Sequence, residues 1–151
     1  MLTISSSLAR GEGEDKSGPE LAELCEQAGL EVQTQLLPDD REAIAAALRG
    51  LADEDAVRFI FTTGGTGLTP DDVTPEATLD VIDREAPGYA ETIRANSIPY
   101  TKGLGILTRG VSGIRGRTLI VNFPGNPKAI GQSWGIVEQT LDHAAQTLER
   151  E

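Results

Sequence analysis

The stretch FIFTTGGTGLTPDDVTPEAT, residues 59–78, decides the fold that we expect for this chain. It begins with a short apolar run of strand-forming residues, Phe59–Phe61, which passes directly into a glycine-rich turn. Gly64, Gly65 and Gly67 carry no Cβ atom, so a ligand can come close to their backbone amides. The pattern predicts either an anion site at the end of a strand or a tight strand-to-helix turn in an ordinary α/β domain.

Two carboxylates and a helix start complete the stretch. Asp71 and Asp72 follow the glycines, and Thr74 is expected to cap a helix that opens at Pro75. A proline at this first helical position loses no hydrogen bond, because the N–H group that it lacks would have no partner there. The aspartates either bind a ligand or only favour helix entry through the helix dipole.

Composition indicates a single domain, residues 1–151, of a globular protein with a hydrophobic core. Hydrophobic residues make up 38% of the chain and charged residues 25%. No apolar run reaches the ~20 residues of a membrane span, and Met1 leads straight into Leu2 without a signal peptide, so we expect a cytoplasmic protein. Cys25 has no second cysteine to pair with, and it lies on the apolar stripe of a predicted helix, where we expect it to be buried.

The net charge of −11 argues against a nucleic-acid partner bound through a general basic surface. The charge is uneven along the chain. Residues 84–128 hold seven basic and two acidic residues, a sum of +5, which leaves −16 for the rest of the chain. This segment is either a set of solvated side chains or a positive wall that faces an anionic ligand.

Strands and helices alternate along most of the chain. This order predicts a three-layer α/β/α domain with a mostly parallel central sheet, to which the last two strands add an antiparallel element. A loop is expected at 6–16, a capping box at Ser17–Glu20, and a glycine turn around 110–116. The expected strands are 2–5, 30–37, 57–62, 105–108 and 118–123, and the expected helices are 17–28, a segment around 44–51, 75–84, 89–96 and 128–150.

In an open parallel sheet, ligands bind outside the carboxyl ends of the strands. Four loops with polar or glycine residues follow predicted strands there, namely Ser5–Ser7, Asp39–Asp40, Gly64–Asp72 and Pro124–Lys128. Their convergence favours a ligand site over four unrelated turns.

The residue types available restrict the chemistry of that site. His143 is the one histidine and lies on the last predicted helix. The chain therefore lacks the residues that a Ser-His-Asp mechanism or a zinc site requires. TTGGTG lacks the lysine of a Walker A loop and the spacing of a dinucleotide fold. Backbone amides, carboxylates and a few basic side chains remain, which suits phosphate binding with Mg²⁺ held by Asp39 and Asp72. Each aspartate alone could equally be a turn former or a helix cap.

TTGGTG, DDVTPEAT and IRGRTLIVNFPGNPKAI, together with SGPEL and LLPDD, closely resemble molybdopterin adenylyltransferases of the MogA/MoaB type. The resemblance covers nearly the whole chain. It implies a three-layer fold, a homotrimer, and a reaction in which ATP and molybdopterin give adenylyl-molybdopterin and pyrophosphate with Mg²⁺. It also implies molybdenum cofactor biosynthesis, with a metal-insertion enzyme of the same pathway as a possible partner, and no membrane.

The resemblance assigns roles to residues that match the family motifs. Asp39 and Asp72 match the two functional aspartates and are the expected Mg²⁺ ligands. The nucleotide loop corresponds to Gly64, Gly65, Thr66 and Gly67. The residues that match the molybdopterin side are Ser5, Ser97, Asn122, Pro124, Gly125, Asn126 and Pro127.

Two departures from the family keep other functions open. The family commonly has Ser-Asp-Arg after the first strand, whereas this chain has Ser5-Ser6-Ser7, and the later Leu-Ser-Arg is Leu107-Thr108-Arg109. The first departure removes an acid and a base from one rim of the site. The alternatives are therefore a non-catalytic molybdopterin-binding paralogue and a CinA-like nucleotide hydrolase.

Overall fold

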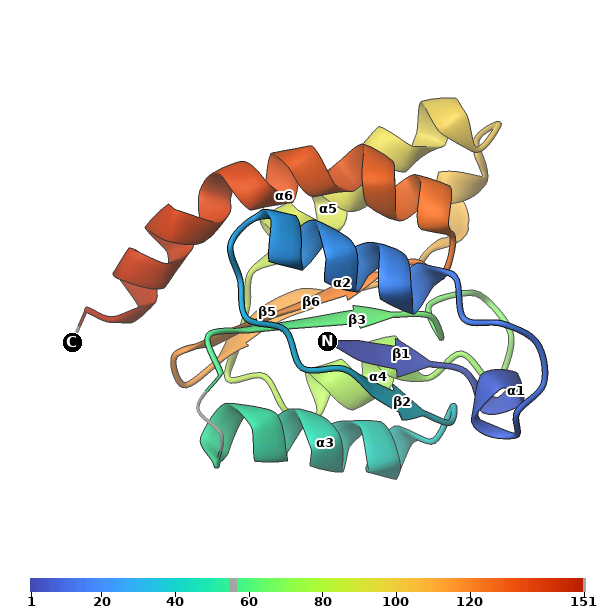
Figure 1. Ribbon diagram of the computed structural model, residues 1–151, viewed down its shortest axis with the longest axis horizontal. Helices are drawn as coiled ribbons and strands as arrows, with labels where there is room; N and C mark the ends of the chain where they lie inside the picture. The colour runs from blue at the N-terminus through green and yellow to red at the C-terminus, as the bar shows by residue number, and fades with distance from the viewer. Residues whose placement is uncertain (55–56, 151) are drawn as a thin grey trace.

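A six-stranded sheet forms the centre of the computed structural model, which describes residues 1–54 and 57–150 (Figure 1). The strand order is β2-β1-β3-β6-β5-β4, and the first four of these strands are parallel. β5 runs antiparallel to β6, and β4 antiparallel to β5. The strands are β1 Leu2–Ile4, β2 Gln35–Leu37, β3 Phe59–Thr63, β4 Arg84–Glu85, β5 Ser112–Arg115 and β6 Thr118–Phe123.

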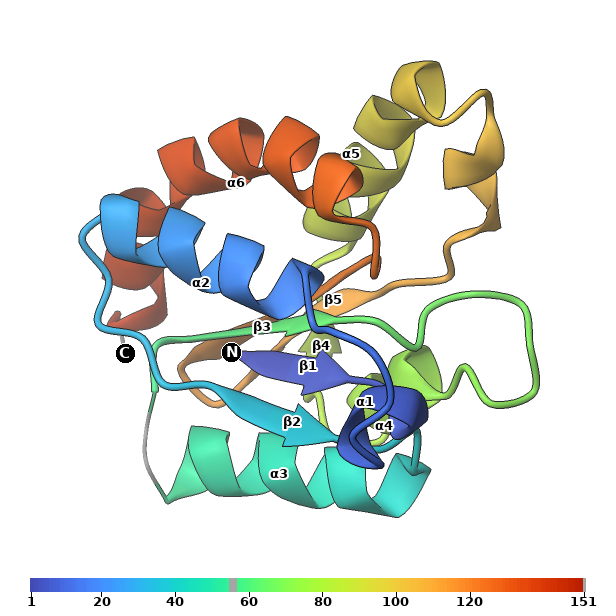
Figure 2. The same cartoon turned by 45° about the vertical axis from the view of Figure 1, so that its right-hand side comes forward.

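Helices cover both faces of the sheet, which confirms the predicted three-layer α/β/α class. α2, α5 and α6 lie on one face, and α3 and α4 lie on the other (Figures 1 and 2). None of the helices in the described residues is long and apolar enough to span a membrane. The helices are α1 Ser6–Ala9, α2 Ser17–Gln27, α3 Arg41–Asp53, α4 Thr74–Leu79, α5 Pro87–Ser97 and α6 Pro127–Leu148, with 3₁₀ turns η1 Ile98–Tyr100 and η2 Leu104–Leu107.

The central strands are apolar on both faces because both faces are covered. Ile60 and Ile120 point into the core beneath α3 and α4, while Phe61 and Val121 point into the core beneath α2, α5 and α6. Trp134 of α6 packs edge-on against Phe61, with ring centroids 5.6 Å apart. These contacts fix the sheet whose carboxyl edge carries the candidate site.

The late antiparallel element exists, but the strand predicted at 105–108 is wrong. Residues 105–107 belong to η2 instead, and the strand that pairs antiparallel with β6 is β5, in the region predicted to be a glycine turn. β5 carries a glycine where the sheet is crowded, since a Cβ atom on Gly113 would lie 2.6 Å from Ile82 Cδ1 and 2.9 Å from the Arg84 carbonyl oxygen. The sheet therefore needs a glycine at this position, while Leu104 and Ile106 of the apolar run are 63% and 69% exposed.

Four local predictions at helix ends are also wrong. The loop predicted at 6–16 begins with α1, because Ser5 Oγ accepts a hydrogen bond from Leu8 N. The capping box at Ser17 does not form, and Asp15 Oδ1 accepts from Gly18 N at 2.9 Å instead. Thr74 lies inside α4 and does not cap it, and the segment after Leu79 leads into β4 rather than continuing as a helix to residue 84.

The strand predicted at 30–37 is formed only over Gln35–Leu37. β1 begins at Leu2, which pairs with Gln35, so residues 30–34 have no strand beside them. Cys25 and His143 lie as predicted, the first buried in the core and the second exposed on α6.

Candidate active site

The loops that follow β1 and β2 are joined by a reciprocal pair of hydrogen bonds. Ser6 N donates to Asp39 Oδ2, and Asp39 N donates to Ser6 Oγ, both at 2.8 Å. Asp39 is thus held at the carboxyl edge of the sheet by a serine of the Ser5-Ser6-Ser7 run. The run that departs from the family pattern is therefore the one that positions this aspartate.

The glycine loop after β3 lies directly against Asp39. Gly64 and Gly65 have φ values of +95° and +65°, the left-handed region that favours glycine. A Cβ atom on Gly65 would lie 3.0 Å from Asp39 Oδ1, and one on Gly64 would collide with the Ile4 carbonyl oxygen. Thr74 Oγ1 donates to the Gly64 carbonyl at 3.0 Å, so α4 holds the loop from its other side.

Asp72 closes the same loop. Its Oδ2 accepts hydrogen bonds from Thr69 N at 3.0 Å and Thr69 Oγ1 at 2.7 Å, and a Cβ atom on Gly67 would lie 2.7 Å from it. Burial would raise the pKa of Asp72, but the bonds from Thr69, the Gly67 amide and the charge of Arg109 together lower it below its ordinary value. Asp72 is therefore an ionised, partly exposed carboxylate at neutral pH, whereas Asp71 is exposed.

Arg109 braces the glycine loop, a role that the local sequence pattern did not predict. Its Nε donates to the Gly67 carbonyl at 2.7 Å, its Nη2 donates to the Asp72 carbonyl at 2.6 Å, and its Nη1 pairs with Glu76 of α4. Arg109 N also donates to the Thr66 carbonyl at 2.8 Å. The only available signal was the match of Leu107-Thr108-Arg109 to a family motif, because the partners are more than thirty residues away.

The Pro124–Pro127 loop after β6 lies beside the glycine loop. A Cβ atom on Gly125 would lie 3.4 Å from Gly64 Cα, and Thr63 Oγ1 donates to the Pro124 carbonyl at 3.0 Å. Asn126 caps α6, since its Oδ1 accepts from Lys128 N at 3.0 Å, and Pro127 occupies the first turn. The structure thus brings together the two loops predicted to bind nucleotide and molybdopterin.

A cavity of about 380 Å³ opens between this loop and the η1–η2 region. Two lysines, Lys102 and Lys128, line it, and neither forms an ion pair with another residue that the structure describes. Other cations of the basic segment are bound inside the molecule, Arg109 with Glu76 and Arg115 with Asp53. The cavity is lined by Ser97, Tyr100, Thr101, Lys102, Leu104, Gly105, Thr108, Pro124, Asn126, Lys128 and Ala129.

Three predicted site residues have side chains that are engaged inside the fold. Ser97 lines the cavity, but it is 1% exposed and its Oγ donates to the Arg94 carbonyl at 2.9 Å. Asn122 is 2% exposed, and its amide bonds to Val111 N, Thr62 Oγ1 and Thr78 Oγ1. Thr66 is also buried, and its hydroxyl accepts from Thr108 Oγ1 at 3.1 Å. These side chains hold the site's backbone in place, and Ser5 likewise caps α1 with its hydroxyl.

The arrangement offers two adjoining binding regions on one edge of the sheet. The first holds the glycine loop and two carboxylates, Asp39 and Asp72, and the second is the cavity with two lysines. Over residues 1–54 and 57–150 no cluster of three or more His, Cys, Asp or Glu side chains is placed to hold a metal ion. A cation here would therefore take its remaining ligands from bound phosphate groups and water.

A family model described as "Probable molybdopterin binding domain" matches residues 1–143. The chain therefore belongs to the molybdopterin-binding domain family of molybdenum cofactor biosynthesis proteins. Within that family it is similar to the molybdopterin adenylyltransferase of Haemophilus influenzae, with 40% identity over 136 residues that make up 88% of this chain and 68% of that protein.

Two further relatives agree with this assignment. The Drosophila melanogaster molybdenum cofactor synthesis protein cinnamon is 38% identical over 150 residues, 98% of this chain, although the chain spans only 25% of that protein. The crystal structure of the molybdopterin biosynthesis enzyme MoaB from Thermus thermophilus superposes with a TM-score of 0.88 at 42% identity, covering 97% of this chain and 92% of that one.

Proposed function

We propose that this protein is a molybdopterin adenylyltransferase that transfers AMP from ATP to the terminal phosphate of molybdopterin. The observation that carries this proposal is the contact between the two loops, with Gly125 seated against Gly64. This contact would place an adenine nucleotide on the glycine loop within reach of a second anionic substrate in the lysine-lined cavity. Relatives named molybdopterin adenylyltransferase support the same reaction.

The reaction needs no histidine base, which agrees with the exposed position of His143 outside the site. A phosphate monoester is largely ionised at neutral pH, with a second pKa near ~6, so the molybdopterin phosphate is itself a nucleophile. Its oxygen forms a bond to the α-phosphorus of ATP, and the bond from that phosphorus to the pyrophosphate oxygen breaks. The chain's task is to hold two polyanions in line.

The residues present fit a hard divalent cation such as Mg²⁺. Asp39 and Asp72 flank the glycine loop, Asp39 Oδ1 faces Gly65, and hydrogen bonds keep Asp72 ionised. Two carboxylates with phosphate oxygens make a typical Mg²⁺ site. The cation would screen the negative charge of the transferring phosphoryl group when it is bound there.

Other groups of the chain would bind the two substrates or hold the site in shape. Within the Gly64–Gly67 loop, the amides of Gly64 and Gly67 donate to the Phe123 carbonyl and to Asp72, so the amides of Gly65 and Thr66 would bind the nucleotide phosphates. Lys102 and Lys128 would hold the molybdopterin phosphate. Ser97 and Asn122, whose side chains are satisfied internally, would contribute by shaping the cavity wall and the end of β6. Ser5, Pro124, Asn126 and Pro127 would contribute through the loop and helix ends that they hold.

One assay separates the three candidate functions. The protein is incubated with ATP, Mg²⁺ and molybdopterin, and adenylyl-molybdopterin and pyrophosphate are measured. Both products are expected, in equal amounts and only when molybdopterin is present. Binding of molybdopterin without turnover would indicate a non-catalytic paralogue, and ATP hydrolysis without molybdopterin would indicate a CinA-like hydrolase.

The family assignment also supports proposals about the setting of the reaction. We propose a homotrimer of single-domain chains in the cytoplasm, which hands its product to a metal-insertion enzyme of the same pathway. Sedimentation of the purified protein measures the assembly state.

A further inference from the structure

The segment that carries η1 and η2, residues 98–107, forms one wall of the 380 Å³ cavity beside the candidate site. In Figure 2 it stands out beyond the sheet on the side where α6 begins. Tyr100 and Leu104 of this segment line the cavity, and each is 63% exposed. Packing against the rest of the fold therefore does not explain why two large apolar side chains lie here.

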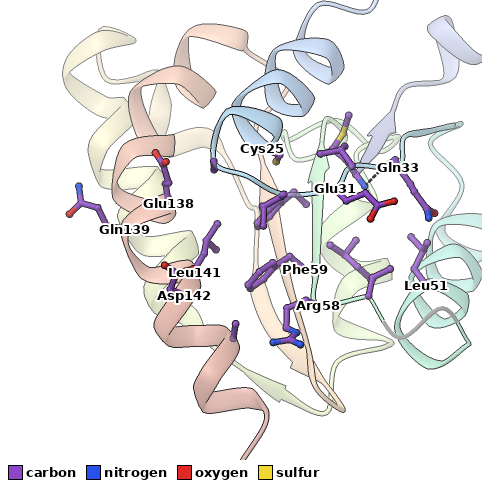
Figure 3. A pocket seen from close by; sticks show the side chains of 18 of the residues that line it. Cys25, Glu31, Gln33, Leu51, Arg58, Phe59, Glu138, Gln139, Leu141 and Asp142 are labelled. Carbon is purple, nitrogen blue, oxygen red and sulfur yellow. Dashed lines mark hydrogen bonds between the residues drawn. The ribbon is translucent and has the colours of Figure 1, made fainter.

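A larger cavity, of about 930 Å³, lies at the opposite end of the sheet, but its charges do not suit an anion. The acidic residues that line it are Glu31, Glu138 and Asp142 (Figure 3). Its one basic lining side chain among the described residues, Arg58, pairs with Glu149 at 2.6 Å. The smaller cavity holds Lys102 and Lys128, two of the three lysines of the chain, so it is the better place for a substrate that carries phosphate.

Lys102 has a backbone conformation that lysine seldom adopts. Its φ of +53° makes it the one non-glycine residue with a positive φ in residues 1–54 and 57–150. Glycine and asparagine adopt this left-handed region at lower cost, so the backbone at this position does not favour lysine. Residues strained in this way persist only where their surroundings hold them, and they cluster at ligand sites. The left-handed angle thus indicates a role for the side chain of Lys102.

Hydrogen bonds hold the turn in which Lys102 lies. The hydroxyl of Thr101 donates to the Ser97 carbonyl and accepts from Gly105 N, both at 2.8 Å. These bonds join the turn to the end of α5 and to η2. The ammonium group of Lys102 forms no hydrogen bond or ion pair with the part of the chain that the structure describes. A fixed turn therefore presents an uncompensated positive charge at the cavity.

Tyr100 lies two residues earlier on the same turn. Its hydroxyl group has no hydrogen-bond partner among the described residues, so no polar contact accounts for its position. An exposed aromatic ring is a surface on which a flat heterocycle can stack. The Cα atoms of Tyr100 and Lys102 are at most about 7 Å apart, so a stacked ring and a phosphate on the ammonium group can belong to one ligand.

We propose that Tyr100 and Lys102 determine the specificity for the second substrate, Tyr100 by stacking on its pterin ring and Lys102 by binding its terminal phosphate. The inference rests on the proposed function for the identity of that substrate. Stacking does not require the phosphate, and the ion pair does not require the ring. Each residue therefore contributes to affinity only when the matching part of the ligand is present.

Binding of 6-hydroxymethylpterin and of its monophosphate ester, each without ATP, separates the two contributions. Fluorescence of the pterin ring reports binding, and stacking on Tyr100 is expected to quench it. Tyr100→Ala is expected to remove the quenching and to weaken both ligands at least fivefold, whereas Tyr100→Phe keeps a ring and the affinity. Ile106→Ala, at an exposed residue of η2 that does not line the cavity, is the control. Unchanged affinity of Tyr100→Ala for both ligands would overturn the stacking role.

Lys102→Asn removes the charge and suits the backbone. Asparagine tolerates a positive φ better than lysine, so the melting temperature is expected to stay the same or rise. The monophosphate ester is expected to bind at least tenfold more weakly, and 6-hydroxymethylpterin with unchanged affinity. Lys16→Asn removes the same charge at an exposed residue outside the cavity and leaves both affinities intact. Equal weakening of the two ligands by Lys102→Asn, or undiminished binding of the ester, would overturn the phosphate role.

Steady-state kinetics distinguishes this inference from the proposed reaction. In an active enzyme, Tyr100→Ala and Lys102→Asn are expected to raise KM for molybdopterin at least fivefold and to leave KM for ATP unchanged. A native chain that binds both pterins as described but transfers no AMP would support the turn and contradict the reaction. An active enzyme whose two variants keep the native KM for molybdopterin would overturn the role of the turn alone, as would a native chain that does not bind the monophosphate ester.

Discussion

At the scale of single residues, the glycines of the nucleotide loop serve the fold before any ligand arrives. Gly64 and Gly65 take left-handed backbone angles, and neither has space for a Cβ atom. A sequence pattern cannot separate this need from the approach of a phosphate group, since both require the same residue. Two variants can separate these needs if both have the same backbone strain but only one places its new Cβ atom against neighbouring atoms.

Gly65→Val is such a variant, with Gly29→Val as its control. Both glycines have positive φ, +65° and +83°, so both variants pay about 1–2 kcal/mol of backbone strain. Only the new side chain at 65 meets Asp39 and Thr74, whereas nothing lies within 4 Å of the Cβ position at 29. Calorimetry is expected to show ATP binding weakened at least tenfold in Gly65→Val and unchanged in Gly29→Val. Equal ATP affinity in both variants would remove the loop from the nucleotide site.

Asp72→Asn tests the proposed charge of the site. The amide keeps the size of the carboxylate and can still accept from Thr69, so the melting temperature is expected to change by only a few degrees. Adenylyl transfer is expected to fall by about 10² to 10³, the usual loss for removal of one electrostatic group from a preorganised site. Asp71→Asn, at the exposed neighbour, is the control and should turn over normally. Near-normal turnover of Asp72→Asn would refute its role.

At the scale of elements, Arg109 joins the loop after β3 to α4 and to the segment before β5. Arg109→Met removes the bonds to the Gly67 and Asp72 carbonyls and the ion pair with Glu76 while keeping an aliphatic side chain. A misplaced loop is expected to reduce kcat/KM by roughly ten- to a hundredfold. Arg115→Met is the matched control, because Arg115 also bonds a carboxylate and a carbonyl, those of Asp53 and Val81, at the far end of the sheet. Similar kinetic losses in both variants would mean that the effect is general destabilisation.

Glu76 makes the same brace sensitive to acid. The hydrogen bond from Arg109 lowers the pKa of Glu76 below its ordinary value. The stabilisation is therefore fully present above the ordinary carboxylate pKa of about 4.3 and is lost as the pH falls through the lowered value. The difference in melting temperature between the native chain and Glu76→Gln is expected to be constant from about pH 5 to 8 and to shrink below pH 4.3. A difference that grows toward acid pH would contradict this linkage.

Sequence pattern predicted elements well where local propensity and tertiary neighbours agree. The apolar run at 59–61 became β3, and the turn chemistry of Asn126-Pro127 became the start of α6. The sequence pattern failed where a residue distant in the sequence determines the local structure. At Gly113, for example, the side chain of Ile82 leaves no room for a Cβ atom. Residues 30–34 have strand propensity, but no strand of the described chain pairs with them, so propensity alone could not fix the length of β2. Asp39 and Asp72 were found from loop position, whereas Arg109 depends on contacts that only the fold creates.

At the scale of the whole molecule, the two ends of the parallel sheet differ in chemistry. The carboxyl ends carry the glycine loop, two carboxylates and the cavity with Lys102 and Lys128. The amino ends carry a cavity of about 930 Å³, lined by apolar residues and by Glu31, Arg58, Glu138 and Asp142.

Cys25 reports on the integrity of the whole fold, because it lies in the core between α2 and the sheet. Burial raises the pKa of its thiol to about 11, so little thiolate forms in the folded protein at pH 8, and reagents have no access. Alkylation by iodoacetamide at pH 8 is therefore expected to be slow in buffer and to accelerate with urea along the same transition as the loss of circular dichroism. Since the unfolded thiol ionises first, stability should decline as the pH rises from about 9 toward 11. Rapid labelling before the unfolding transition would show that the α2 side of the core opens independently of the rest of the molecule.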